Sequence, residues 1–143
     1  MRNLWIVPIL ALMFTGTGCE TPPPQPVEIG ASDMCTQCKM AISEKRYAAE
    51  AIDPDGEVLK FDSIDCMLRY ASAHGLKEKA RAWFVMDSEG NKWLDARSAF
   101  LVSAVTIPGP MGAGILATGD RTSATELSAR FSGKVLTFAD LWR

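Results

Sequence analysis

The sequence predicts an α+β protein made of two small subdomains that pack together, each with mainly antiparallel strands in the order strand, strand, helix, strand. Three observations predict this class: short strands alternate with turns, two stretches have helical periodicity, and the same order of elements occurs in both halves. Residues in the two halves hardly match, so the repeat rests on element order alone. A chain of 143 residues is long enough for two such units around a shared core.

The first residues have the pattern of an export signal. Met1 and Arg2 precede an apolar run from Leu4 to Phe14, and small or polar residues follow up to Cys19. The run is well short of the roughly 20 residues that a membrane-spanning helix needs. We therefore expect residues 1–18 to be a signal peptide that is removed.

Cys19 follows Gly18 in a pattern that resembles a bacterial lipobox, although Gly16 occupies a position where that pattern usually has Leu. The resemblance implies that Cys19 is diacylated and becomes the first residue of an exported, membrane-anchored lipoprotein that faces the periplasm. Ordinary cleavage nearby, with Cys19 left as a free thiol, is the alternative. Two acyl chains anchor a protein without any transmembrane helix.

A proline-rich segment follows the predicted lipidation site. Proline recurs between Thr21 and Val27, which predicts an extended polyproline segment that rises about 3.1 Å per residue. We expect residues 19–32 to be a lipid-anchored tether between the membrane and the folded part.

The first subdomain is expected over residues 33–97. Its helix begins at Asp62 or Ser63, runs to about Ala73 with an apolar stripe that includes Met67, and ends before Gly75. Turns rich in Asp and Gly separate its strands. The expected strands are 47–52, 58–61, 81–86 and 92–94.

The second subdomain is expected over residues 98–143. A loop of glycine and proline residues, 108–114, separates its first two strands, and a short helical turn ends the chain at 138–142. The remaining expected elements are strands 100–105, 115–118 and 134–137 and a helix over 123–131.

Sulfur side chains are concentrated just before the first strand. Met34, Cys35, Cys38 and Met40 fall close together, and thiolate and thioether donors favour Cu(I) over Zn(II), Cu(II) and hard cations. Cys38 and Met40 are two residues apart, so in an extended segment both point to the same face and can bind one ion. We expect a Cu(I) site at these two residues.

A third donor has to come from elsewhere in the chain. Met111 lies alone among glycine, proline and alanine residues, which keep neighbouring bulk away and allow it to approach an ion held by the first half. The predicted metal ligands are therefore Cys38, Met40 and Met111, with Cys35 as a further candidate. A methionine in such a loop can also simply fill an irregular gap, and this alternative stays open.

At these residues the sequence resembles the NosL family, the accessory lipoproteins of nitrous oxide reductase. The resemblance covers residues 33–143 in element order, and its specific parts are the Cys35-x-x-Cys38-x-Met40 motif, the stretch 61–67 and Pro110-Met111-Gly112. It implies a periplasmic Cu(I) metallochaperone with paired ββαβ subdomains. The implied partners are a copper-accepting membrane transporter complex and, indirectly, nitrous oxide reductase. The resemblance also implies Cys38 and Met40 as ligands, but the family commonly has Gly where this chain has Lys39.

The cysteines also have other interpretations. Cys35 and Cys38 can form a disulfide in an oxidising compartment. If Cys19 is lipidated, however, three cysteines remain and one thiol stays unpaired. Cys66 falls within the predicted helix and is expected to be a small buried apolar residue.

Three rival functions use the same residues. A thiol-disulfide redox lipoprotein would need the Cys35/Cys38 pair at a helix N-terminus, but the pair precedes the first hairpin. Covalent haem attachment fits the run 35–39 only as a rare lysine variant. A structural zinc site in an interaction domain would have four donors, Cys35, Cys38, Cys66 and His74. However, Cys66 and His74 would lie about 12 Å apart along the helix, too far to share an ion.

Catalysis and nucleic-acid binding find little support. Asp62 and Asp65 stand at a helix N-terminus, where a carboxylate usually acts as a cap or a dipole partner, and no triad can be assembled around His74. Gly112-Ala113-Gly114 lacks the lysine of a phosphate loop. The formal net charge is −2 without a basic cluster, which argues against a nucleic-acid partner. We therefore expect a protein that is not an enzyme.

Overall fold

The structure is a computed structural model and describes residues 22–143. The predicted signal peptide, residues 1–18, and the predicted lipidation site, Cys19, lie outside the described residues. None of the helices in the described part is long and apolar enough to cross a bilayer.

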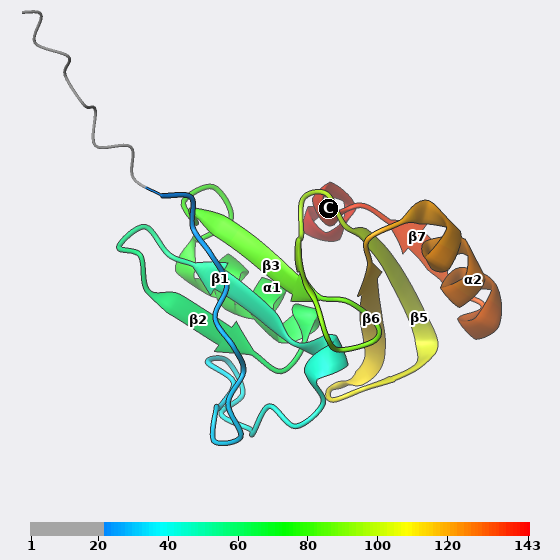
Figure 1. Ribbon diagram of the computed structural model, residues 1–143, viewed down its shortest axis with the longest axis horizontal. Helices are drawn as coiled ribbons and strands as arrows, with labels where there is room; N and C mark the ends of the chain where they lie inside the picture. The colour runs from blue at the N-terminus through cyan, green and yellow to red at the C-terminus, as the bar shows by residue number, and fades with distance from the viewer. Residues whose placement is uncertain (1–21) are drawn as a thin grey trace, which may run out of the picture.

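The first half of the chain forms a four-stranded antiparallel sheet with the order β2-β1-β3-β4 and one helix. A short 3-10 helix, η1, precedes the sheet. The helix α1 crosses behind the sheet in Figure 1. The elements are η1 (Lys45–Tyr47), β1 (Ala49–Ile52), β2 (Val58–Phe61), α1 (Ile64–His74), β3 (Ala82–Met86) and β4 (Trp93–Asp95).

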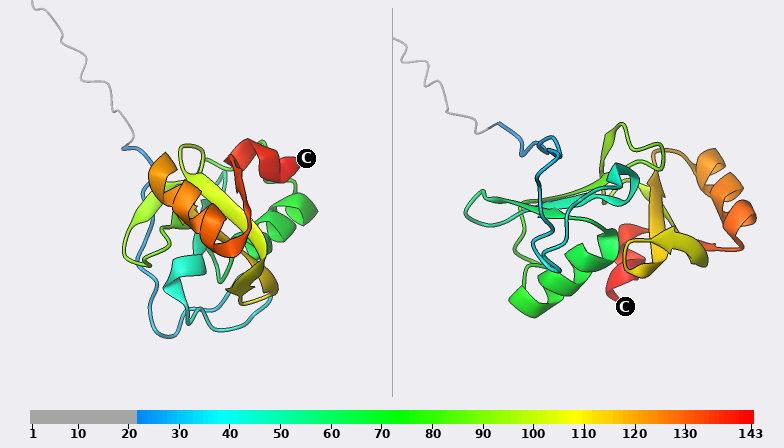
Figure 2. Two further views of the ribbon diagram at one scale, coloured as in Figure 1. Left: turned by 90° about the vertical axis from the view of Figure 1, so that its right-hand side faces the viewer. Right: turned by 90° about the horizontal axis from the view of Figure 1, so that it is seen from below.

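The second half forms a three-stranded antiparallel sheet with the order β6-β5-β7. Its helix α2 lies on the side of this sheet that is away from the first half (Figures 1 and 2). The elements are β5 (Phe100–Gly109), β6 (Gly112–Thr118), α2 (Arg121–Phe131), β7 (Lys134–Leu136) and η2 (Phe138–Trp142).

The α+β fold class with antiparallel strands is therefore confirmed, and each half has the predicted order. Both helices begin at a polar cap: Ser63 Oγ accepts from the Cys66 N–H, and Asp120 Oδ1 accepts from the Ser123 N–H. The second helix begins two residues earlier than predicted because Asp120 supplies the cap.

One apolar core joins the two halves. It contains residues of the first sheet and α1, such as Trp83 and Met67, together with Leu101 of β5 and Ala117 of β6. A smaller cluster fills the space under α2 and includes Val102 and Leu116. The second sheet is therefore packed on both faces, between α2 and the shared core.

The glycine and proline residues before β6 do not form the predicted loop. β5 continues to Gly109, β6 begins at Gly112, and a two-residue turn of Pro110 and Met111 joins them. A Cβ on Gly109 would lie 2.9 Å from the Cα of Gly114, so the two strands approach too closely for larger residues. The small residues serve a tight hairpin, and the loop prediction was wrong for that reason.

The segment before the first sheet is partly bound to it. We call residues 27–30 the strap; it crosses in front of the sheet in Figure 1, on the face opposite α1. The Val27 N–H donates to Glu50 Oε2 at 2.9 Å, the Trp93 indole donates to the Val27 carbonyl at 3.1 Å, and Lys60 donates to the Glu28 carbonyl at 3.0 Å. Within the predicted tether over 19–32, Val27 and Glu28 are therefore bound to the sheet and Ile29 is buried.

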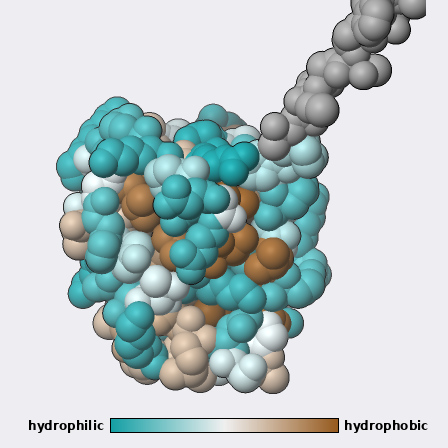
Figure 3. All heavy atoms as spheres, turned by 90° about the vertical axis from the view of Figure 1, so that its left-hand side faces the viewer, coloured by the Kyte–Doolittle hydropathy of each residue, from teal (hydrophilic) through white to brown (hydrophobic). Residues whose placement is uncertain are grey.

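The surface is mixed in polarity on the side that carries the β1–β2 turn. Figure 3 shows mostly hydrophilic residues there, with hydrophobic side chains visible between them near the centre. Two of the most exposed large apolar side chains of the described residues are Met34 and Met40, at 53% and 52% exposure.

Candidate metal centre

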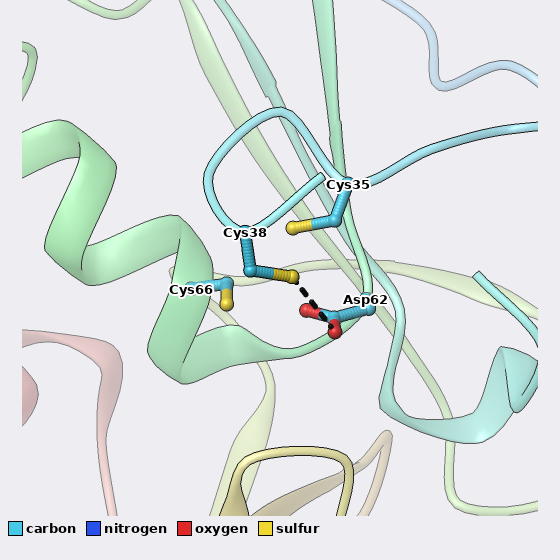
Figure 4. Close-up of side chains that lie close together, drawn as sticks. All are labelled: Cys35, Cys38, Asp62 and Cys66. Atoms are coloured by element: carbon cyan, nitrogen blue, oxygen red, sulfur yellow. Dashed lines mark hydrogen bonds between the residues drawn. The ribbon is translucent and has the colours of Figure 1, made fainter. Parts of the chain in front are cut away.

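Three thiols and one carboxylate come together where the segment before the first sheet meets the start of α1. One ligand atom from each of Cys35, Cys38, Asp62 and Cys66 lies within 4.8 Å of the other three. Figure 4 shows the four side chains pointing toward a common centre from a loop, a strand end and a helix. The three cysteines of the described residues are free thiols.

A tight loop presents Cys35 and Cys38. Met34 and Ala41 pair as an isolated antiparallel bridge, the Cys35 N–H donates to the Met40 carbonyl at 2.8 Å, and the Lys39 N–H donates to the Cys35 carbonyl at 3.0 Å. The prediction of an extended strip with Cys38 and Met40 on one face is therefore wrong: the backbone turns back on itself between them. The loop places Cys38 beside Cys35 instead.

Lys39 has the backbone conformation that glycine favours. Its φ is 63°, in the left-handed region. The related motif commonly has Gly at this position, and the loop geometry supplies the reason. Lys39 keeps the same turn and donates from Nζ to the Thr36 carbonyl at 2.6 Å.

The loop is fastened to the edge of the first sheet at Lys60 of β2. The Thr36 N–H donates to the Lys60 carbonyl at 2.7 Å, and the Lys60 ammonium forms a salt bridge with Asp33 at 2.5 Å. The salt bridge holds the pKa of the Asp33 carboxyl below its ordinary value, because Lys60 stabilises the ionised form. These contacts fix Cys35 and Cys38 relative to the strand that leads into Asp62.

Asp62 and Cys66 come from the corner between β2 and α1. Ser63 is the cap of α1, and the structure thereby decides between Asp62 and Ser63. Asp62 is only 3% exposed and turns into the cluster, where its Oδ2 accepts from the Cys38 thiol at 3.3 Å. Its Oδ1 is buried without a hydrogen-bond partner among the described residues. The sequence interpretation of Asp62 as a cap or dipole partner missed this role.

The surroundings of Cys66 and Cys38 favour the protonated form of these two thiols. Burial raises the pKa of the Cys66 thiol and, to a smaller extent, that of Cys38. Cys66 lies in the first turn of α1, where the helix dipole partly opposes this effect. A cation bound at the cluster would replace the thiol protons, as metal binding to cysteine generally does.

The two predicted methionine ligands are on the surface. Met40 follows Lys39 at the end of the loop, and Met111 forms part of the β5–β6 turn with 40% exposure. In Figure 1 this turn and the loop after Met34 lie along the same lower edge of the molecule. Both thioethers are open to solvent, and neither belongs to the cluster of three thiols and a carboxylate.

Two other predictions are resolved by the geometry. Cys66 is fully buried, as expected for a small apolar residue, but it also belongs to the cluster, a grouping that the sequence suggested only in the zinc alternative. The available signal was its position three residues after the Ser63 cap, which brings its side chain back to the helix start. His74 lies at the other end of α1, where its ring contacts the Tyr70 carbonyl at 2.9 Å.

Comparisons with known proteins agree on one family. The sequence model of the NosL family matches residues 26–143. Among solved structures, the chain is similar to the crystal structure of the copper chaperone NosL from Shewanella denitrificans, with 21% sequence identity and a TM-score of 0.75. That alignment covers 82% of this chain and 96% of the other. Among curated protein sequences, none matches this chain.

Proposed function

The chain belongs to the NosL family, and from that premise we propose that it is a non-catalytic copper chaperone that carries Cu(I). The observation that carries the proposal is the gathering of three free thiols, those of Cys35, Cys38 and Cys66, with the exposed thioether of Met40 two residues after Cys38. Sulfur donors of these two kinds favour monovalent copper over hard cations. The name of the similar solved structure, a copper chaperone, supports the same cargo.

Cys38 is the anchoring donor in this proposal. It is the half-buried member of the cysteine cluster, between the fully buried Cys35 and Cys66 and the exposed Met40. The methionine thioethers of Met40 and Met111 complete a three-coordinate site at the surface, with Cys35 as an additional candidate donor. An ion held near the surface by neutral thioethers can pass to a partner without unfolding the loop.

The family resemblance and the lipobox-like sequence support a proposal for delivery and location. We infer that the exported protein is anchored through diacylated Cys19 and faces the periplasm. Its acceptor is a copper-accepting membrane transporter complex, and the copper finally serves cluster assembly in nitrous oxide reductase. Radiolabelled palmitate incorporation tests the anchor: wild type takes up label, and Cys19→Ala does not. Uptake by Cys19→Ala would exclude Cys19 as the lipidated residue.

Copper binding is tested by titrating the reduced protein with Cu(I) against a chromophoric Cu(I) chelator. Wild type removes one equivalent from the chelator, whereas Cys38→Ser does not compete. Met40→Leu and Met111→Leu each bind more weakly, and Met86→Leu, a core methionine remote in sequence, serves as the matched control. Unchanged affinity in Cys38→Ser would exclude this site.

The competing function is that of a thiol-disulfide redox lipoprotein, because Cys35 and Cys38 are neighbouring free thiols. The loop that carries them precedes the first sheet, and neither residue stands at a helix N-terminus, where thiolates of redox pairs are usually stabilised. Insulin reduction by the purified protein distinguishes the two functions. Turnover that depends on both cysteines, without Cu(I) uptake, would favour the redox function.

A further inference from the structure

The buried half of the cysteine cluster contains a donor that a Cu(I) site does not require. Asp62 is a hard oxygen donor, 3% exposed, whose side chain points into the cluster (Figure 4), and its Oδ1 has no partner among the described residues. An unpartnered carboxylate oxygen in the protein interior destabilises the fold unless something binds it. A soft monovalent ion gains little from a carboxylate, whereas a borderline divalent ion accepts sulfur and oxygen ligands together.

We propose that Cys35, Cys38, Cys66 and Asp62 form a second metal site, a four-donor site for Zn(II), beneath the proposed surface copper site. His74, which the sequence suggested as the fourth ligand of a zinc site, is at the far end of α1, and Asp62 takes its place. The two sites share Cys38, so Zn(II) and Cu(I) compete for it.

The donor positions fit tetrahedral zinc. With Zn–S bonds of about 2.3 Å and Zn–O bonds of about 2.1 Å, tetrahedral geometry separates two sulfurs by about 3.8 Å and a sulfur from an oxygen by about 3.6 Å. Cys38 Sγ and Asp62 Oδ2 are already 3.3 Å apart, and the four donor atoms lie within 4.8 Å of one another. Rotation of the side chains that moves the donor atoms by about 1 Å therefore closes the site, without movement of the strand or the helix.

The charge of the site also favours a divalent ion. Three thiolates and a carboxylate are all negative, so Zn(II) cancels twice as much charge as Cu(I) does in this buried position. The N-terminus of α1 adds partial positive charge, because Cys66 is in its first turn. The helix start and the divalent ion together compensate the negative charge of the four ligands.

The site has consequences for copper loading. When Zn(II) occupies it, Cys38 is turned inward and is withheld from Met40 and Met111. Copper then has to displace zinc or enter a zinc-free protein. The protein therefore takes up Cu(I) more weakly when zinc is present.

Co(II) is the probe for this site because, unlike Zn(II), it has a spectrum that reports its ligands. Titration of the reduced full-length mature protein with Co(II) is expected to give one equivalent of tetrahedral complex, with intense visible bands and sulfur-to-cobalt absorption in the near ultraviolet. Zn(II) then displaces the cobalt and abolishes the bands. An octahedral spectrum, or no uptake, would overturn the proposal.

Matched variants identify the ligands. Asp62→Asn and Cys66→Ser are each expected to lower Co(II) and Zn(II) affinity by at least about 100-fold, given that even outer partners of metal ligands contribute 10- to 100-fold. Asp65→Asn, one helical position before Cys66, is the matched control and binds like wild type. Equal binding by Asp62→Asn and Asp65→Asn would show that the carboxylate is not a ligand and would refute the four-donor site.

Two further measurements keep the result interpretable. Far-ultraviolet circular dichroism establishes that each variant is folded, and Met111→Leu separates the two metals: it weakens Cu(I) binding and leaves the Co(II) spectrum unchanged. In the wild-type protein, absence of Zn(II) and Co(II) binding with intact Cu(I) binding would refute only this inference. In the wild-type protein, absence of Cu(I) binding with an intact Co(II) spectrum would refute only the proposed copper function.

Discussion

Three residues of the first half have an unfavourable backbone conformation or an unpartnered buried carboxylate oxygen. Lys39 has a left-handed backbone, and Asp62 and Glu50 each bury a carboxylate oxygen without a partner among the described residues. Unfavourable backbone conformations and unpartnered buried polar groups both occur commonly at functional sites. The features at Lys39 and Asp62 lie beside the candidate metal donors, and the one at Glu50 lies under the strap.

At Lys39, replacement by glycine is expected to stabilise the protein. A left-handed residue with a Cβ is less favourable than glycine by about 1 kcal/mol or slightly more. Lys39→Gly should therefore unfold with a free energy about 1 kcal/mol above that of Lys39→Ala, which keeps the Cβ and also loses the lysine hydrogen bond. Urea denaturation measures both. Equal stability of the two variants would contradict the assigned backbone conformation.

Glu50 makes stability depend on pH. Burial raises the pKa of this carboxyl from its ordinary 4.5 to about 7 in the folded protein. Because the folded value is the higher one, the contribution of the Glu50 carboxyl to stability is fully present below pH 4.5 and is lost as the pH rises through 7. At about 1.4 kcal/mol per pKa unit, the contribution of Glu50 to the free energy of unfolding should fall by about 2.5 kcal/mol between pH 5 and pH 8.

Denaturation at a series of pH values measures this loss. Glu50→Gln should remove most of the slope, since the amide does not ionise and its oxygen still accepts from the Val27 N–H. Glu78→Gln, at an exposed position, is the control and should retain the slope. A slope that survives in Glu50→Gln would assign the effect to other groups.

At the scale of elements, short strands bounded by strong turns were predictable. β2 matches its predicted bounds, and α1 and η2 were placed within a residue or two, because Ser63, Gly75 and Asp53-Pro54-Asp55-Gly56 are local signals. The loop at the cysteines was not predictable in the same way. Its turn depends on Thr36 bonding to Lys60, which is distant in the sequence.

The β5–β6 hairpin allows a prediction about close strand approach. Gly109→Ala should destabilise the protein by about 1–3 kcal/mol, because the new Cβ meets the Gly114 backbone, which cannot turn away. Gly119→Ala is the matched control: its Cβ meets only a Leu94 side-chain carbon at 3.5 Å. Thermal unfolding compares them. Equal melting temperatures would mean that the hairpin strands can separate without loss.

At the scale of the whole molecule, the two sheets share one core, so the subdomains are not expected to unfold separately. Leu101 is fully buried on β5 and packs in the cluster that includes Trp83 and α1. Leu101→Ala should lower the free energy of unfolding by about 2–5 kcal/mol. Hydrogen exchange should increase in α1 and α2 together, and faster exchange confined to α2 would contradict a single cooperative unit.

The candidate site illustrates what a sequence can and cannot predict. Cys38 and its neighbours were identifiable from donor chemistry, because soft ligands in a short motif are a local property. Asp62 and Cys66 joined them only through the corner between β2 and α1, where a cap position also directs two side chains toward a distant loop. The kind of donor could be predicted from the local sequence, whereas the positions of the donors in space depended on the fold.

The strap fixes the N-terminal segment of the described chain to the first sheet. Its hydrogen bonds to Glu50, Trp93 and Lys60 run along the sheet, and the described chain starts at one end of the first half while the cysteine loop lies at the other (Figure 1). If acyl chains hold Cys19 in a bilayer, the cysteine loop lies at the end of the first half that is away from the start of the described chain. Copper would then be exchanged at a distance from the lipid surface, with an acceptor whose docking surface extends beyond the headgroups.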